Sequence, residues 1–440
     1  MSGSECYNLA MKKFGTILAV ILGLGVLAAG TIAAIPPLRE SALFELNSLR
    51  TNVQYALHPP QEAVFVPEVE LATIVQATMQ SLDPTATPTP LPSPTLETPG
   101  PTQAPTPTAT PLPSAVTLGG IRYIDQHGLW NYCAPATLAM ALTYWGWEGD
   151  RTDVGQVVKP FDKDKNVMPY ELADYVNTHT QFQAIVRTGG DLNVLKRLVA
   201  EEFIVVVEKG IVIKDYNGRL GWVGHYAVVS GYDDAKQEFM TQDAYFSADY
   251  PVSYTDLMNQ WRNFNYTFIV IYPPALEDNA LQALAEYADE TNSYRIAAQT
   301  AANEIIALDG VQQFFAYFNR GTSLVNLQDY AGAATAYDQA FLLMAALPEE
   351  ERPWRMMWYQ TGPYFAYYYT GRYADVISLA DNTIFYASEP YIEESFIWRA
   401  RALIMLGDYG AAEEDVRRSL ELHPGFTPAL DLAAQLGIQP

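Results

Sequence analysis

A long run rich in proline and threonine interrupts this sequence. Residues 83–115 consist mainly of Pro, Thr, Ser and Ala, as in PTATPTPLPSPT. Such a segment has too little apolar surface to offset the entropy of ordering, and its prolines favour extended polyproline II conformations. At ~3.1 Å per residue it spans up to roughly 90 Å. We therefore predict a disordered, semi-rigid linker that separates an N-terminal segment from the folded domains.

The N-terminal segment contains a run long enough to cross a membrane. Lys12 and Lys13 precede residues 15–35, which carry no charge. At about 1.5 Å per residue this run spans a hydrocarbon core of ~30 Å, and the lysines favour a cytoplasmic N-terminus. We predict a cytoplasmic tip and transmembrane helix over residues 1–36, a stalk over 37–82, and extracellular domains beyond. The alternative is a signal peptide cleaved near Ala33 and Ala34, which would release a secreted protein.

The charge balance limits the partners of the exported part. The 440 residues contain 26 Lys and Arg against 50 Asp and Glu, a net charge of −24. A surface of this sign repels nucleic acid and anionic lipid headgroups. We therefore expect no nucleic-acid partner, and a membrane association that depends on the N-terminal anchor alone.

The two cysteines lie on opposite sides of the predicted membrane span. Cys6 precedes the span and Cys133 follows it. An anchored chain cannot pair them internally, and an unpaired thiol in an oxidising compartment is typical of a reactive residue rather than a structural one. Cys133 is thus a candidate nucleophile.

The residues around Cys133 predict a helix that begins at the thiol. Pro135 suits the first helical turn, Leu138 and Leu142 recur at helical spacing, and Gly146 can close the helix in a left-handed conformation. The unpaired N–H groups and the dipole at a helix N-terminus favour the thiolate, which is the nucleophilic form. The alternative is a small buried thiol on a core helix.

Residues 116–274 read as an α+β domain. Helices are predicted over 169–177 and over 191–201, the second capped by Asp191, and another helix follows the capping box at Ser253. Strands are predicted over 203–207, 225–231, 237–242 and 266–272. A helical first half followed by an antiparallel sheet defines the fold class.

A histidine and an aspartate fall on neighbouring strands of that sheet. His225 begins one predicted strand and Asp243 ends the next. Adjacent antiparallel strands would place them side by side, so that the carboxylate fixes the imidazole tautomer. The alternative is that His225 is a packing residue.

The order of these residues resembles that of papain-like cysteine peptidases, in particular the double-glycine leader (bacteriocin-processing) peptidases and their stand-alone relatives. The resemblance covers residues 118–273 and rests on Gln126, on Cys133-Ala-Pro-Ala-x-Leu-Ala-Met, on Gly-His225-x-x-Val-Val-x-Gly-Tyr, and on the Asp243 strand. It implies that Cys133 is the nucleophile, His225 the base, Asp243 its orienting partner, and Gln126 an oxyanion donor together with the Cys133 backbone N–H. The family usually has Gly directly after the cysteine, where this chain has Ala134, so its methyl group is expected to crowd the substrate carbonyl. Because no ATP-binding cassette is present, cleavage after double glycine does not carry over.

The C-terminal part, residues 275–440, is predicted to be all-α and repetitive. Three segments align through Ala333, Val376 and Ala412, and the last of them looks like a tetratricopeptide repeat. The first interval is longer than the second, which implies an insertion around residues 348–354. Such arrays bind peptides or proteins, and the alternative is a buttress for the preceding domain. The aromatic residues 364–369 are expected to be packing core.

These patterns predict an exported, membrane-tethered cysteine peptidase with a helical repeat domain that holds protein or peptide. No metal-ligand spacing and no phosphate-binding glycine loop is present, so no cofactor is expected. Two alternatives remain open. One is a catalytically silent surface binding protein, and the other is a cell-wall amidase or endopeptidase, since those enzymes also use a Cys-His pair in this order.

Overall fold

The structure is a computed structural model that describes residues 111–214, 220–387 and 391–439, together with Ala42, Leu46, Leu49, Val53, Phe65 and Pro67. The predicted membrane-spanning run and the linker up to residue 110 lie outside the described residues. Within the part that is described, no helix combines the length and the apolar character needed to cross a membrane.

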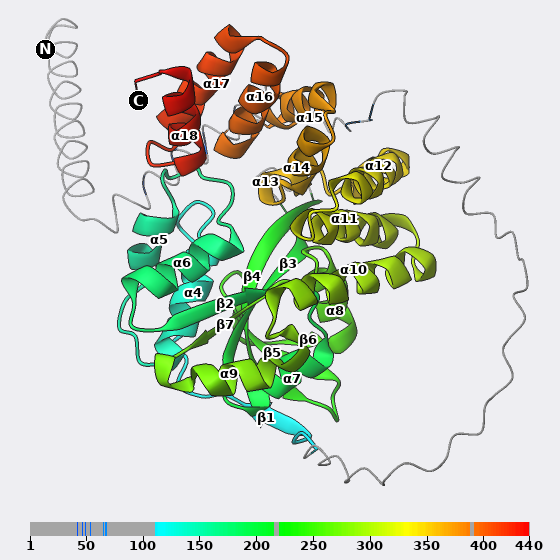
Figure 1. Cartoon of the computed structure of the whole chain (residues 1–440). Coiled ribbons are helices and arrows are strands. Elements are labelled where there is room, and N and C mark those ends of the chain that lie inside the picture. The colour runs from blue at the N-terminus through cyan, green and yellow to red at the C-terminus, as the bar shows by residue number, and fades with distance from the viewer. Residues whose placement is uncertain are drawn as a thin grey trace, which may run out of the picture.

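A single antiparallel sheet forms the centre of the first folded part (Figure 1). Its strands follow the order β2-β7-β3-β4-β5-β6, and β1 pairs with β4. The strands span Ala115–Thr117 (β1), Gln183–Arg187 (β2), Ile204–Lys214 (β3), Leu220–Asp233 (β4), Glu238–Asp243 (β5), Ser247–Ser253 (β6) and Phe268–Tyr272 (β7).

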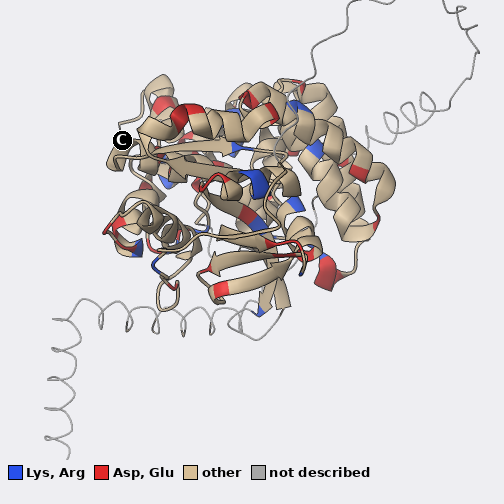
Figure 2. Cartoon of the chain, turned by 90° about the horizontal axis from the view of Figure 1, so that it is seen from below, with Lys and Arg blue, Asp and Glu red and all other residues tan. Residues whose placement is uncertain are grey.

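Acidic residues are spread over strands, loops and helices alike (Figure 2). Several are held by arginines inside the helical part, where Asp338 pairs with Arg372 at 2.7 Å and Asp415 pairs with Arg399 at 2.6 Å. The acidic surplus that the composition predicts is therefore a property of the whole fold rather than of one tail.

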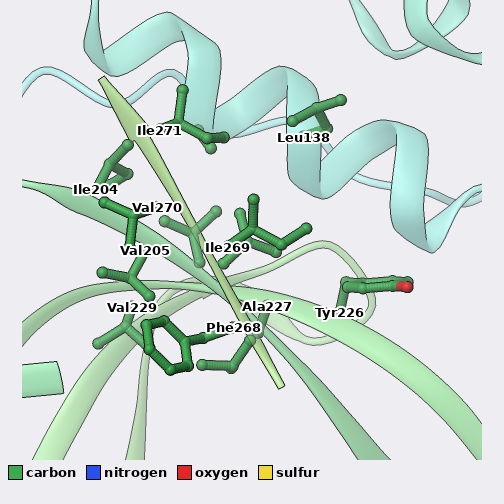
Figure 3. Close-up of a cluster of buried hydrophobic side chains, with 14 of the residues drawn as sticks. Leu138, Ile204, Val205, Tyr226, Ala227, Val229, Phe268, Ile269, Val270 and Ile271 are labelled. Carbon is green, nitrogen blue, oxygen red and sulfur yellow. The ribbon is translucent and has the colours of Figure 1, made fainter. Parts of the chain in front are cut away.

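Helix α4 packs on the sheet and is buried on nearly every side. It spans Cys133–Tyr144, and Gly146 follows it with a φ of +82°. Leu138 of this helix belongs to the same buried cluster as the apolar strand residues of Figure 3, which include Ile204, Ile269 and Ile271. The predicted helix start at Cys133 and the left-handed glycine after its end are both confirmed.

The remaining helices of this part are α5 (Arg151–Val158), α6 (Pro169–His179), α7 (Leu192–Ala200) and α8 (Tyr254–Arg262). Asp191 caps α7 and Ser253 caps α8 through bonds to the backbone N–H groups three residues on, as predicted. The predicted helices and the antiparallel sheet therefore stand, which confirms the α+β class of this region.

Four elements were not predicted, and two strands are longer than expected. Strands β1, β2 and β6 and helix α5 are short or polar, and β6 carries Pro251, which an edge strand tolerates. Strand β4 begins at Leu220, so His225 lies in its interior and not at its start, which corrects the prediction. The beginning of this strand was not predicted because it contains Gly221 and Gly224, and glycine in a strand pattern usually indicates a break.

The chain after residue 273 is helical, as predicted. Its helices are η1 (Pro274–Leu276), α9 (Glu277–Leu284), η2 (Ala285–Tyr287), α10 (Glu290–Ala307), α11 (Gly310–Asn326), α12 (Tyr330–Ala346), η3 (Glu349–Glu351), α13 (Met356–Tyr359), α14 (Gly362–Tyr369), α15 (Tyr373–Tyr386), α16 (Glu393–Met405), α17 (Tyr409–Leu422) and α18 (Thr427–Leu436). Ala280, Leu284 and Tyr287 belong to the same core as the sheet, so the helical array proper begins with α10.

Small residues allow the helices of the array to approach each other closely. Ala333, Val376 and Ala412, which align the three sequence segments, are completely buried. A Cβ atom at Gly321 would lie 2.7 Å from the Tyr337 ring, so α11 and α12 need glycine there. The insertion predicted around residues 348–354 contains η3 and extends to α13.

Aromatic packing fills the array, and one residue of the predicted stalk joins it. Tyr364 and Tyr367 are fully buried, in agreement with their predicted packing role, whereas Tyr369 is 56% exposed and that part of the prediction is wrong. Phe65 is also buried, and its ring centroid lies 5.2 Å from that of Phe341. The predicted stalk is therefore packed against the helical part at this position and does not stand apart from it.

Candidate active site

Three of the four predicted site residues line one cleft. Gln126, Cys133 and His225 form part of the wall of a cleft of about 600 Å³, and Asp243 lies behind His225, fully buried. The fold thus brings together Cys133 and Asp243, which are more than a hundred positions apart in the chain.

Cys133 occupies the first position of α4. Tyr132 precedes it without a side-chain cap, so no carboxylate or hydroxyl of the N-cap residue occupies the N-terminal N–H groups. Asn131 adopts a φ of +51°, and its Nδ2 donates to the Asp164 carbonyl oxygen at 2.6 Å. This turn holds the half-buried thiol at the helix start, where the dipole stabilises negative charge.

His225 and Asp243 form a direct pair on adjacent strands. His225 Nε2 lies 2.7 Å from Asp243 Oδ1, and β4 and β5 run antiparallel as predicted. Because Nε2 faces the carboxylate, Nδ1 is the ring nitrogen that remains for the thiol. Cys133 is hydrogen-bonded to the imidazole and contributes to its titration.

The Asp243 carboxylate is fixed from several directions. The backbone N–H groups of Tyr245 and Phe246 donate to Oδ1 at 3.0 and 3.3 Å. The Tyr245 ring also packs edge-on against His225, with the ring centroids 6.4 Å apart. The carboxylate therefore has little freedom to turn away from the imidazole.

Lys209 is a member of this cluster that sequence reasoning missed. It lies on β3 directly opposite His225 in the β3–β4 register, and only 1% of its side chain is exposed. Its Nζ lies 3.0 Å from Asp243 Oδ2. A signal was present in the sequence, because a lysine inside the apolar run FIVVVEKGIVIK needs a buried anion as partner.

The buried charges of this cluster shift the pKa of His225 and the pKa of Asp243. Burial by itself lowers the pKa of His225, but the charge of Asp243 and its hydrogen bond, followed by those of Cys133, outweigh burial and raise this pKa to about 9. Burial raises the pKa of Asp243, but His225 and Lys209 outweigh it and bring this pKa well below its usual range. At neutral pH the cluster therefore holds an imidazolium beside a carboxylate.

Gln126, the predicted oxyanion donor, lines the same cleft as Cys133. Its backbone N–H donates to the Ala244 carbonyl oxygen at 3.0 Å, which ties it to the residue after Asp243. Its side-chain Oε1 is buried and has no hydrogen-bond partner among the described residues. Ala134, the departure from the usual glycine, is only 1% exposed and packs in the sheet core while it also borders the cleft.

The helical part completes the cleft through α13 and the residue before it. Arg355, Trp358 and Tyr359 line the cleft together with Cys133, and Arg355 Nη1 donates to the Trp222 carbonyl oxygen at 2.9 Å. A Cβ atom at Gly221 would lie 2.7 Å from Arg355 Nη1, so glycine in β4 permits this approach. This contact depends on tertiary packing and left no signal in the sequence.

No metal centre was predicted from the sequence. Among the residues that it describes, no three His, Cys, Asp or Glu side chains are grouped so that they could hold an ion.

A cysteine at the start of a central helix, with a His-Asp pair on neighbouring strands of an antiparallel sheet, is the arrangement expected of a papain-like cysteine peptidase. In agreement with it, residues 119–269 match the model of the Peptidase_C39 like family. A solved structure, described as that of a candidate C39-like peptidase from Bacillus anthracis, is 18% identical over 36% of this chain and 96% of its own, with a TM-score of 0.30. A comparison with curated proteins finds no match. The family match ends before the helical part, whose resemblance to tetratricopeptide repeats stays a prediction.

Proposed function

We propose that this chain is a cysteine peptidase that hydrolyses peptide bonds with Cys133, His225 and Asp243. The observation that carries the proposal is the buried His225–Asp243 pair at 2.7 Å, hydrogen-bonded to a thiol at a helix N-terminus. A neutral packing histidine has no need of a buried carboxylate, and the pair maintains the imidazolium that stabilises a thiolate.

The proposed reaction proceeds through a thioester. The Cys133 thiolate attacks the carbonyl carbon of the scissile bond, and His225 Nδ1–H protonates the departing amine. His225 then removes a proton from water, the hydroxide attacks the thioester carbonyl, and the carboxylic acid product leaves as the thiolate is restored. Asp243 holds the imidazole in place throughout and compensates its charge.

Gln126 and the Cys133 backbone N–H are the proposed donors to the oxyanion of each tetrahedral intermediate. Gln126 lines the same cleft as the thiol, and its position is fixed by the backbone bond to Ala244. These two donors would bind the oxygen more strongly as it gains negative charge.

We propose further that the enzyme is exported and held at the cell surface by its N-terminal segment, with the helical part helping to hold a protein or peptide. The lysine pair before an uncharged run supports the first point, and the location of α13 in the cleft wall supports the second. Protease added to intact cells should remove the region 116–440. Protection of that region would contradict export.

The catalytic proposal is tested by labelling and turnover together. Incubation with a peptidyl chloromethyl ketone, followed by peptide mapping, should place the adduct on Cys133, and mixed peptide substrates should be cleaved by the same preparation. Neither event is expected with Cys133→Ala. A chain that binds peptides but is never labelled and never cleaves them would be a silent binding protein. Digestion of purified peptidoglycan in place of peptides would identify a cell-wall enzyme.

A further inference from the structure

Phe65 belongs to the hydrophobic core of the helical array, although the array begins more than two hundred positions later in the chain. Its side chain is 4% exposed, and its ring meets that of Phe341 on α12 edge to face, at an interplanar angle of 84°. The ring centroid of Tyr367 on α14 lies 6.0 Å away. Aromatic pairs in such arrangements add a directional attraction to the burial of apolar area. Phe65 is thus held between two helices of the array.

The residue types buried at this place suit a short peptide ligand. Pro67 is buried as well, so an aromatic residue and a proline lie inside the fold two positions apart. Proline has a fixed φ and loses no side-chain freedom on burial, and phenylalanine loses little for the apolar area that it buries. An aromatic residue followed by proline therefore binds at a low cost in conformational entropy.

Both ends of the linker between residues 67 and 115 are attached to the same folded body. Phe65 shares its buried cluster with Trp222 of β4. Ala115, at the other end, begins β1, which pairs with that same strand. The proline- and threonine-rich segment therefore joins two points of one body, and residues 37–64 lie between the predicted transmembrane helix and Phe65.

We propose that the helical array is a receptor for this chain's own N-terminal segment, which it binds through Phe65 and Pro67. The array then attaches the folded domains to the N-terminal anchor independently of the linker, so that cutting the linker does not release them. The site recognises an aromatic residue followed two positions later by proline. This inference goes beyond the proposed peptidase function and does not rest on it.

The test cuts the chain between the N-terminal segment and the folded domains. Residues 92–98 of full-length Cys133→Ala protein are replaced by the recognition sequence of a site-specific protease, and an affinity tag is added at the C-terminus. After complete cleavage in mild detergent, the tagged domains should retain the N-terminal fragment on the affinity resin. Loss of the fragment after cleavage would overturn the proposal.

Matched variants locate the contact. Phe65→Asp places a carboxylate in an apolar site and should reduce the retained fragment at least about tenfold. Val53 lies on the same segment and is 51% exposed, so Val53→Asp introduces the same charge without burying it and should change nothing. An equal loss in both variants, or in neither, would contradict docking through Phe65.

A competing peptide tests the site with Phe65 in place, so its result does not depend on the folding of Phe65→Asp. An excess of the peptide EAVFVPEVE, which has the sequence of residues 62–70, should displace the fragment from the cleaved protein. The same peptide with alanine in place of phenylalanine should not displace it. Displacement by both peptides or by neither would contradict recognition of the aromatic residue.

The mass of the uncut protein decides whether the segment binds within its own chain. Size-exclusion chromatography with light scattering should give the same mass for the Cys133→Ala protein with and without Phe65→Asp. A larger assembly that requires Phe65 would place the segment in the array of a second copy, and would overturn the intramolecular proposal. Every arm uses protein without Cys133, so failure of the peptidase function leaves these outcomes unchanged.

Discussion

Two buried clusters of titratable residues in this molecule differ in the signs of their charges. The mixed cluster contains two cations and one anion, Lys209, His225 and Asp243. They lie on three neighbouring strands, and each of their side chains is at most 3% exposed. The acidic cluster lies at the junction with the helical part and contains four carboxyl groups, those of Asp164, Glu171, Glu393 and Glu394. Asn166 Nδ2 donates to Glu394 Oε1 in this cluster at 3.2 Å.

The two clusters titrate in opposite directions. In the mixed cluster the pKa of Asp243 is lowered and that of His225 is raised to about 9, so both stay charged at pH 7. In the acidic cluster burial, followed by repulsion from neighbouring carboxylates, raises the pKa of Asp164 and of Glu394, and burial raises that of Glu171 to about 7. Asp243 stays charged because His225 and Lys209 together outweigh its burial, whereas at Asp164 burial and the neighbouring carboxylates outweigh the attraction of Lys159. The proposed catalytic chemistry needs the first arrangement.

The largest expected effect is on turnover at the mixed cluster. Cys133→Ala or His225→Ala alone should remove roughly a thousandfold or more of kcat/KM, and the double variant should lose little more, because the two residues act as a unit. Steady-state kinetics on a cleaved peptide measures this. Losses that simply multiply in the double variant would mean that the residues act independently.

Neutralising a charge in the mixed cluster should destabilise the fold. Lys209→Met removes one partner of a buried ion pair and leaves Asp243 Oδ2 without its cation, so the free energy of unfolding at pH 7 should fall by about 3–5 kcal/mol. Urea unfolding followed by tryptophan fluorescence measures it. Lys236→Met, at an exposed pair, is the control and should change stability by less than about 1 kcal/mol. If both variants behave alike, the buried pair contributes nothing.

Asp243→Asn should move the pH profile of the reaction. Burial lowers the pKa of His225, but the charge of Asp243 outweighs burial and raises this pKa from the unfolded value of ~6.5 to about 9. The imidazolium of the wild-type protein therefore persists up to about pH 9. The stability from this pair is fully present below pH ~6.5 and is lost as the pH rises through about 9. In Asp243→Asn the basic limb of kcat/KM should fall at least about one pH unit lower. If the basic limb does not move, Asp243 does not control the pKa of His225, which contradicts the prediction.

Neutralising a charge in the acidic cluster should stabilise the fold, and this should be the smallest of the expected effects. Glu394 has a raised folded-state pKa, so its destabilising effect is absent below the unfolded value of ~4.3 and grows as the pH rises. Glu394→Gln should therefore raise the melting temperature by about 2–4 °C at pH 8 and leave it unchanged at pH 4. Glu421→Gln, exposed on α17, should change it at neither pH. A destabilised Glu394→Gln would overturn the contrast between the clusters.

Local sequence patterns predicted part of the site, and pairings across the sheet determine the rest. Cys133, His225 and Asp243 were found because helix-start and strand patterns, with their order in the chain, define where each lies. Lys209 was missed because a single strand pattern does not say which residue faces it across the sheet, although its register partner is His225.

The helical wall of the cleft could not be predicted for a related reason. The irregular repeat interval indicated an insertion, but nothing local to residues 355–359 says that they contact β4. Gly221 and Gly224, which permit that contact, read instead as a strand break. Pairings between distant segments decide these features, whereas helix starts and apolar strands are set by neighbouring residues.

The most direct test of the central claim is the rate at which iodoacetamide modifies Cys133 at pH 6, measured by peptide mapping in the wild-type protein and in His225→Ala. The mixed cluster should hold Cys133 as a thiolate paired with the imidazolium. We predict rapid modification in the wild-type protein and a rate at least about tenfold lower in the variant. Equal rates in the two proteins, both matching that of a free cysteine peptide, would contradict an activated nucleophile.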